Sequence, residues 1–297
     1  MPQFHPPPWG GGGCYRKGRW WGTTPTLPAG IPPLKGEGID GLAVAEKPQP
    51  DNAMNILILG GTAEARALAE RLVDLGHAVT TSLAGRTSSP LLPAGELRVG
   101  KFGGIPGLVG YLTARRIDRL VDATHPYAGL ISINAAAAAE RTGIPLVRFM
   151  RPPWPEPPGA GWHHVADTAA AAAELPSGTT VLVTTGHEGL APLFGRDDCT
   201  LVVRLIEPPD PPLPRGVRLI LSRPPYTLAS EMALFAREGV THLVCKNSGS
   251  PQTAAKLEAA RQQGITVIMI ARPLYGPAVE VATLDDAIVA LHLGASG

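Results

Sequence analysis

Small and polar residues follow the first short apolar run of this chain, in an arrangement that favours the binding of an anion. Gly60, Gly61 and Thr62 come directly after residues 55–59, and Glu64 lies two positions further on. Two glycines let a ligand approach the backbone closely, and the start of a helix attracts negative charge. We therefore predict that these four residues contact a substrate. The spacing is not G-x-G-x-x-G, and it also fits an ordinary tight turn.

A second polar turn, with the sequence THPYA over residues 124–128, follows the apolar run 119–123. A histidine and a tyrosine beside a proline-fixed turn are suited to substrate binding or proton transfer. We predict that His125 and Tyr127 are catalytic and that Thr124 contacts substrate. The alternative is that His125 has only a structural role, capping the end of a strand.

Three apolar runs in the second half of the chain also end in hydroxyl, amide or cationic side chains. The carboxyl ends of parallel strands meet at one edge of a sheet, so these groups would form a cradle for a phosphate-bearing ligand. The alternative is a scattered, solvated surface. The predicted cofactor-binding residues at these ends, and at the start of the next helix, are Thr185, Gly186, Arg223, Lys246, Asn247, Ser248 and Thr253.

Four further arginines lie within or near the expected strands. Arg204 could meet the ribose 2′-phosphate of NADP, a place where dinucleotide-binding domains favour cations, and it also fits an ordinary edge-strand arginine. Arg86, Arg148 and Arg151 lie at or near strand ends of the first half. Each could bind a carboxylate or be a solvated surface residue. We include Arg86 and Arg151 among the predicted substrate-binding residues.

The elements that would position these residues alternate regularly from Met54 onward. Short apolar strands are separated by helical stretches of about 10–15 residues, which is typical of β-α-β units and of parallel sheets buried on both faces. The Pro/Gly-rich segment 151–162 interrupts this alternation. The predicted fold class is α/β, with two Rossmann-like, doubly wound parallel-sheet domains over 54–153 and 154–297 and a cleft between them.

Composition excludes several classes of function. The 26 Lys and Arg residues against 25 Asp and Glu residues argue against a non-specific nucleic-acid binder, which needs surplus cations. Cys14, Cys199 and Cys245 have neither zinc-ligand nor disulfide spacing. No apolar run is long enough to span a membrane. We therefore predict a cytoplasmic protein with no metal site, no membrane contact and no nucleic-acid partner.

Residues 1–53 differ from the rest because glycine and proline punctuate them throughout. We predict a disordered extension or a mis-assigned start, with the working chain beginning near Met54. The competing interpretation is a tryptophan-rich arm in which Trp9, Trp20 and Trp21 bind something.

Seven short motifs occur in an order that resembles the precorrin-6A reductase (cobalt-precorrin-6A reductase) family of cobalamin biosynthesis. The resemblance covers about residues 54–275. The motifs are LGGTAEARALA (59–69), DATHPYA (122–128), RPPW (151–154), TTGHEGL (184–190), SRPP (222–225) with Glu231, KNSG (246–249) with TAAKL (253–257), and MIARP (269–273). Each motif alone is weak, and their order is specific.

This resemblance implies NADPH as cofactor, an anionic tetrapyrrole as substrate and the reduction of one carbon–carbon double bond of its macrocycle. It leaves open whether that ring carries cobalt. The alternatives are a non-catalytic, two-lobed nucleotide-binding module and another NAD(P)-dependent reductase of a small anionic substrate. A sugar-type reductase is disfavoured because neither Tyr111 nor Tyr127 has a lysine four residues further on. We expect a monomer or a weak homo-oligomer.

Overall fold

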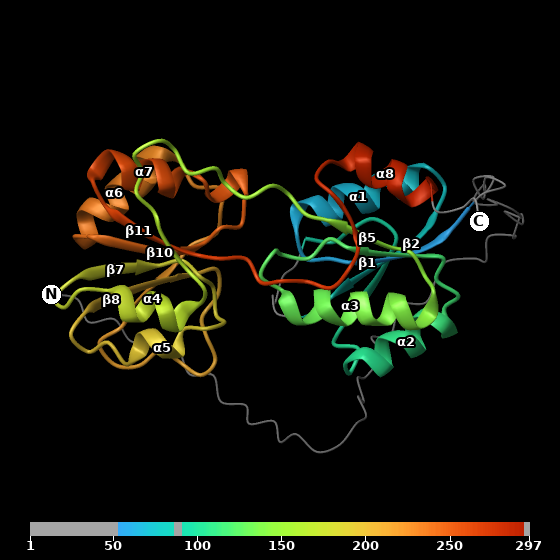
Figure 1. Cartoon of the computed structure of the whole chain (residues 1–297), viewed down its shortest axis with the longest axis horizontal. Coiled ribbons are helices and arrows are strands. Elements are labelled where there is room, and N and C mark those ends of the chain that lie inside the picture. The colour runs from blue at the N-terminus through green and yellow to red at the C-terminus, as the bar shows by residue number, and fades with distance from the viewer. Residues whose placement is uncertain (1–52, 86–90, 294–297) are drawn as a thin grey trace, which may run out of the picture. The chain divides into compact units, whose positions relative to one another are not determined.

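The apolar runs of both halves of the chain form two six-stranded parallel sheets, drawn in Figure 1. The computed structural model describes residues 53–85 and 91–293. The predicted extension up to residue 52 and Arg86 lie outside the described residues. All described residues belong to one unit of the chain, 46–297. The prediction of an α/β fold with two Rossmann-like sheets is confirmed.

The first sheet has the strand order β12-β5-β4-β1-β2-β3. Its strands are β1 (Asn55–Leu59), β2 (Ala78–Leu83), β3 (Glu96–Val99), β4 (Arg119–Asp122), β5 (Leu146–Phe149) and β12 (Val279–Val281). Its helices are α1 (Ala63–Asp74), α2 (Ile105–Ala114), α3 (Gly129–Thr142) and α8 (Leu284–Leu293). Alternate residues of β1 face opposite helix layers: Ile56 and Ile58 pack with α1 and α8, whereas Leu57 and Leu59 pack with α2 and α3.

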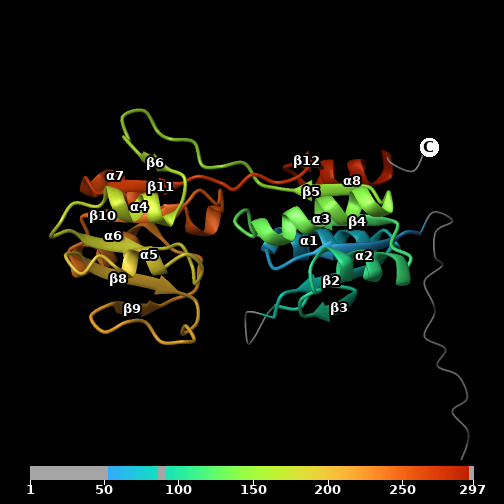
Figure 2. The same cartoon turned by 60° about the horizontal axis from the view of Figure 1, so that its bottom comes forward.

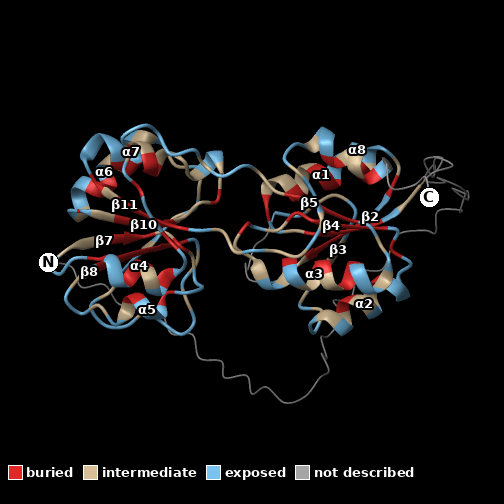
Figure 3. Ribbon diagram, in the orientation of Figure 1, coloured by how far each residue is buried: buried red, intermediate tan, exposed pale blue. Residues whose placement is uncertain are grey.

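The second sheet has the order β6-β11-β10-β7-β8-β9. Its strands are β6 (His163–Val165), β7 (Thr180–Val183), β8 (Thr200–Leu205), β9 (Arg218–Leu221), β10 (His242–Lys246) and β11 (Thr266–Ile270). Its helices are α4 (Thr168–Glu174), α5 (Ala191–Phe194), α6 (Leu228–Glu238) and α7 (Ala255–Gln263), with a 3-10 turn, η1, at Pro251–Thr253. The buried central strands of both sheets appear red in Figure 3, and Figure 2 shows β8 and β9 following one another across the second sheet.

Each sheet receives one edge strand from a segment of the chain that directly follows a strand of the other sheet. β6 follows β5 in the chain but pairs with β11, and β12 follows β11 but pairs with β5. The predicted second domain, 154–297, therefore differs from the structure, because β12 and α8 return to the first sheet. A three-residue edge strand carries too little periodicity to show where it pairs.

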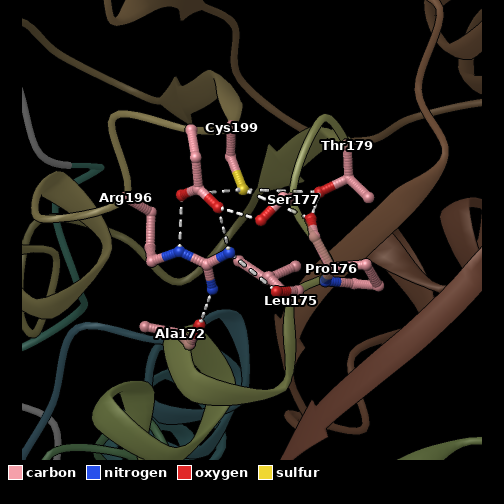
Figure 4. A network of polar contacts seen from close by, with 8 residues as sticks. Ala172, Leu175, Pro176, Ser177, Thr179, Arg196 and Cys199 are labelled. Atoms are coloured by element: carbon pink, nitrogen blue, oxygen red, sulfur yellow. Dashed lines mark hydrogen bonds and ion pairs between the residues drawn. The ribbon is translucent and has the colours of Figure 1, made fainter.

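A polar network at the amino-terminal ends of the second sheet's strands, opposite the carboxyl ends where ligands are expected, fixes the end of α4 (Figure 4). Arg196 donates hydrogen bonds to the carbonyl oxygens of Ala172 and Leu175, which the helix leaves without partners. The same guanidinium donates to Asp198 at 2.7 and 2.8 Å. Cys199 donates weakly to Pro176 O at 3.5 Å. This network is a helix terminus held by side chains, far along the sheet from the predicted ligand-binding edge.

Candidate functional site

Most of the predicted site residues gather at two places where strand order reverses. In the first sheet the reversal lies between β1 and β4, and in the second between β7 and β10. Ligands of open parallel sheets bind outside the carboxyl ends of the strands at such a switch point. The turn Gly60–Thr62 follows β1 and the turn 124–128 follows β4. Residues 184–186 follow β7. Lys246 ends β10, and residues 247–248 follow it.

At the first switch point, Thr62 joins the two strand ends. Its hydroxyl donates to Ala123 O at 2.8 Å and accepts from Ala65 N at 3.0 Å, which caps the twelve-residue helix α1. Gly61 has φ +115°, and a Cβ added there would meet no atom within 4 Å. The turn is thus open on the side where a ligand would approach. A small pocket beside it is lined by Thr62, Glu64, Thr124, Pro126, Phe149, Met150 and Arg151.

A buried charge network holds the neighbouring Thr124 in place. The Thr124 hydroxyl donates to Asp122 Oδ1 at 2.7 Å, and Arg148 Nε donates to Asp122 Oδ2 at 3.2 Å. Arg148 also donates to Gly276 O and to Glu280, which fastens the segment that returns to β12. Arg148 is 1% exposed. It therefore supports the turn from beneath rather than presenting its charge to a carboxylate.

At the second switch point, the turn after β7 contains one buried polar group without a partner in the described part of the chain. Thr185 is 5% exposed, and its hydroxyl has no hydrogen-bond partner among the described residues. Gly186 has φ +81° with open space around it. Beneath the turn, Lys256 of α7 donates to the Thr184 hydroxyl at 3.1 Å. A buried hydroxyl and an open glycine above a buried cation are features that suit an anionic ligand.

The segment 246–248 binds the protein itself as well as lining this edge. Asn247 N donates to the Tyr127 hydroxyl at 2.8 Å, and the Asn247 side chain accepts from Trp154 N at 2.7 Å. Ser248 O accepts from Arg151 Nε at 2.7 Å. The backbone of this segment is therefore largely occupied by contacts with other turns of the protein.

His125 lies among four cations drawn from both halves of the chain. Its surroundings desolvate the ring, and Arg151, Lys246, Lys256 and Arg272 add repulsion, so that the pKa of His125 falls to about 3. Desolvation and the four positive charges act in the same direction, and both favour the neutral ring.

The proton of the neutral His125 ring can be placed from one hydrogen bond. Nδ1 accepts a hydrogen bond from Tyr127 N at 3.2 Å, so that nitrogen carries no proton in this arrangement. The ring is thus neutral at neutral pH, with Nε2 carrying the hydrogen.

Tyr127 and Tyr275 bridge turns that are distant in sequence. The Tyr127 hydroxyl donates to Ile270 O while accepting from Asn247 N, and the Tyr275 hydroxyl donates to Pro126 O. Burial raises the pKa of Tyr127 to about 12. A hydroxyl with its donor and acceptor capacity engaged, and with a raised pKa, is suited to holding the turn rather than to releasing a proton.

The remaining predicted residues have different surroundings. Arg204, expected to meet a 2′-phosphate, is instead buried and donates to both carboxylate oxygens of Glu231, at 2.6 and 3.1 Å. The pair occupies its guanidinium, so Arg204 is not available to a ligand in this structure. Arg223 is exposed, at 3.3 Å from Glu207. Thr253 ends η1, where its amide donates to Ser250 O.

Arg151 lies at the first switch point and pairs with Glu64 at 2.7 Å. The structure adds two cations to this edge that were absent from the predicted set. Lys256 and Arg272 both face His125 electrostatically, and Arg272 donates to Asn247 O at 2.8 Å and Arg151 O at 3.0 Å. Lys256 lies in the motif TAAKL and Arg272 in the motif MIARP, so these motifs were the sequence feature that could have identified them as site residues. Helical periodicity alone gives no reason to expect a lysine on the buried face of α7.

Within the described ranges, 53–85 and 91–293, no group of three or more His, Cys, Asp or Glu residues could hold a metal ion. Among the same residues, no helix is long and apolar enough to cross a membrane.

Two doubly wound parallel sheets, each with polar turns at its switch point, define a class of α/β proteins that bind nucleotides and other anions at these edges. Comparison with known proteins narrows that class. Residues 55–292 match the family model "Precorrin-6x reductase CbiJ/CobK". The chain therefore belongs to the precorrin-6x reductase family, and the resemblance seen in the sequence is confirmed.

Individual relatives agree with this assignment. A precorrin-6A reductase of Rhodococcus erythropolis is 48% identical over 233 residues, covering 78% of this chain and 93% of the relative. One of Rhodobacter capsulatus is 42% identical, covering 77% and 92%. The solved structure of "CobK precorrin-6A reductase" superposes with a TM-score of 0.77 at 39% identity, covering 82% of this chain and 97% of that one.

Proposed function

We propose that this protein reduces one carbon–carbon double bond of precorrin-6A, giving precorrin-6B, with NADPH as the reductant. Family membership supports the reaction class. The observation that carries the substrate class is the set of four cations around His125, at an edge flanked by two open glycine turns. Cations in this arrangement suit the carboxylates of a tetrapyrrole and the phosphates of a dinucleotide. Because both relatives are named for precorrin-6A, we propose the metal-free ring as substrate.

The reaction needs two electrons and two hydrogens. When bound, NADPH supplies both electrons and one hydrogen to one carbon of the double bond. A proton joins the neighbouring carbon, which balances the reduction and leaves NADP⁺. The chain's own contribution is to bind the two ring systems, orient them and exclude water.

The residues of the second switch point fit the cofactor's phosphates. The unpartnered Thr185 hydroxyl and the open Gly186 supply polar contacts and room for close approach, while Lys246 and Lys256 supply positive charge. The twelve-residue α1 with its open Gly61 is the competing place for these phosphates. We favour the second switch point because two lysines adjoin its turn, whereas Arg151 at the first is already paired with Glu64 of α1.

The first switch point then receives the macrocycle. Gly60, Gly61, Thr62 and Thr124 would line it, and Arg151, shared with Glu64, would bind a substrate carboxylate. The cationic surroundings keep His125 neutral, so its Nε2–H is suited to donate a hydrogen bond to the substrate rather than to deliver a full proton. Tyr127 holds the turn that carries His125.

A cytoplasmic location and a monomeric or weakly associated state stay predictions.

The direct test is NADPH oxidation by the purified protein with and without precorrin-6A, followed by the mass of the tetrapyrrole product. We expect oxidation only with the tetrapyrrole present, a product two mass units heavier (about two hydrogens), and slower reaction with NADH. A folded protein that leaves precorrin-6A unreduced with both nucleotides would contradict the proposal. Nucleotide binding without turnover would favour the non-catalytic module, and turnover of the cobalt-containing ring alone would reassign the substrate.

A further inference from the structure

Lys256 is a buried cation whose charge has no carboxylate partner. It lies in the first turn of α7, is 4% exposed, and belongs to the buried face of the helix with Leu257 and Ala260. Its ammonium donates to the Thr184 hydroxyl at 3.1 Å and lies 5.2 Å from the centre of the Trp154 ring. Among the described residues, no carboxylate lies within ion-pair distance of it.

The nearest acidic group that influences Lys256 is already engaged. Glu231 of α6 accepts two hydrogen bonds from Arg204 of β8, and both side chains are buried. The other groups that act on Lys256 electrostatically are Arg204 and the Cys245 thiol of β10. Burial lowers the pKa of Lys256. The interior beside this switch point therefore holds two cations and one carboxylate when Lys256 is protonated.

Such an arrangement is unfavourable for the folded state by itself. Lysine is almost never fully buried unless its charge is paired, because one neutral hydrogen bond does not offset the cost of removing an ammonium from water. Buried, unpaired ionisable groups beside a ligand-binding edge are typical of functional sites. Lys256 is in the right place for one, since it reaches the turn that follows β7.

The contact with Thr184 shows how Lys256 acts on that turn. The Thr184 hydroxyl donates to Val244 O at 3.4 Å, so its oxygen is free to accept from Lys256. Thr184 is followed by Thr185, whose buried hydroxyl has no partner, and by the open Gly186. The buried ammonium thus fixes the first residue of a turn whose next two residues have unused capacity for a ligand.

We propose that Lys256 is a positioning residue that fixes the turn 184–186 through Thr184 and makes this turn bind the pyrophosphate group of a dinucleotide. The identity of the anion as a dinucleotide rests on the proposed function. The requirement for an anion rests on the unpaired charge of Lys256 and on the unpartnered Thr185 hydroxyl. A bound pyrophosphate would supply the negative charge that the protein does not place beside Lys256.

The test compares the variants Lys256→Met, Thr184→Val and the double variant with the wild type, using the full chain. Methionine fills the space of the lysine stem without its charge. Lys101→Met, which removes an exposed lysine from the first half, is the matched control. Calorimetry would give the affinity for inorganic pyrophosphate and for NADP⁺, and a thermal melt without ligand would give stability.

We expect Lys256→Met to weaken pyrophosphate and NADP⁺ binding by about tenfold, the size of one lost charged hydrogen bond, while the melting temperature stays the same or rises. Thr184→Val should weaken binding less, and the double variant should resemble Lys256→Met because the two residues act as one unit. The affinity of the wild type should fall as pH rises and Lys256 loses its proton, and that fall should be absent from Lys256→Met. Lys101→Met should bind both ligands as the wild type does.

Failure of this inference is distinguishable from failure of the proposed cofactor. Suppose that the wild type binds pyrophosphate but not NADP⁺, and that Lys256→Met binds pyrophosphate more weakly. This result would overturn only the identification of the anion as a dinucleotide. Unchanged pyrophosphate affinity in Lys256→Met, with or without a lower melting temperature, would show that Lys256 only supports the fold. A wild type that binds neither anion would overturn the inference as well.

Discussion

The two switch points have the same strand order around them but hold their buried cations differently. Arg148, beneath the first, is surrounded by acceptors from Asp122, Gly276 and Glu280. Lys256, beneath the second, has one hydroxyl acceptor. A cation with fixed partners stabilises the arrangement that it joins, whereas a cation without them destabilises the empty protein and favours a bound anion. We infer that the first edge carries its turns on a rigid, internally balanced support, whereas the second needs a bound anion to balance its buried cation.

Removing the paired cation is the change with the largest expected effect. Arg148→Met would leave the Asp122 carboxylate buried and unpaired, and would release the segment that returns to β12. We expect a loss of about 3–5 kcal/mol in the free energy of unfolding, the usual result of breaking a buried ion pair from one side. Urea denaturation would measure this loss, and Lys256→Met should show no comparable one.

Asp122→Asn combined with Arg148→Met tests the cause of that loss. Because the double variant removes both charges, it should recover part of the stability lost in the single variant. Equal, large losses in Arg148→Met and Lys256→Met would break the proposed difference between the two switch points.

Substitutions in the turn 124–128, which contacts both edges, should have the next largest effect, in this case on activity. His125→Ala and Tyr127→Phe should each lower turnover of precorrin-6A by about 10–100-fold. This lies at or below the roughly 10²–10⁴-fold contribution of a full general acid or base, because neither group is suited to deliver a full proton. Tyr127→Phe acts by removing the hydroxyl that accepts from Asn247 N and donates to Ile270 O. Tyr111→Phe in α2, away from this edge, is the control. Full activity and substrate affinity in both variants would assign a purely structural role to the turn 124–128.

The sequence predicted the sheets and the turns better than it predicted the side-chain partners. Alternating strands and helices placed Gly60, Thr124 and Thr185 at strand ends, because the chain must end each buried strand before it turns. Arg204 was expected at a phosphate, since no local pattern shows that Glu231, on the helix that follows the next strand, is its partner. Tertiary pairing between elements distant in sequence decides such cases.

The same limit applies to the return of the chain to the first sheet. β12 is three residues long and lies at a sheet edge, so its own residues contain no preference for β5 over β9. The glycine turns are recognisable because the backbone geometry restricts the residue type. The burial of Lys256 cannot be recognised in this way. Lysine is usually exposed, and only the packed structure shows that this lysine is buried.

The third prediction concerns cofactor selectivity and separates two arginines of the second sheet. Arg223 is exposed at the end of β9, whereas Arg204 is buried against Glu231. If NADPH binds at this edge, Arg223→Ala should lower the preference for NADPH over NADH by about tenfold, as expected for one lost contact to a phosphate. Arg204→Met should lower stability but leave that preference unchanged. If the preference for NADPH were lost in Arg204→Met, Arg204 would be the residue that binds the 2′-phosphate. Its ion pair with Glu231 would then have to open when the cofactor binds.

The smallest expected effect is a pH dependence of stability that His125 adds to the first edge. The pKa of His125 is lowered in the folded protein to about 3, while the unfolded chain has the ordinary value of about 6.5. The unfolded state therefore binds more protons as the solution becomes acidic, and stability falls as pH decreases through the interval between these two values. His125→Ala should lose less melting temperature than the wild type over that interval, and the two should differ least at neutral pH. Pyrophosphate should reduce the difference, because an anion near Lys246, Lys256 and Arg272 offsets part of the repulsion that keeps His125 neutral. Identical pH profiles for the two proteins would mean that the four cations do not act on this ring, and that the two edges are electrostatically independent.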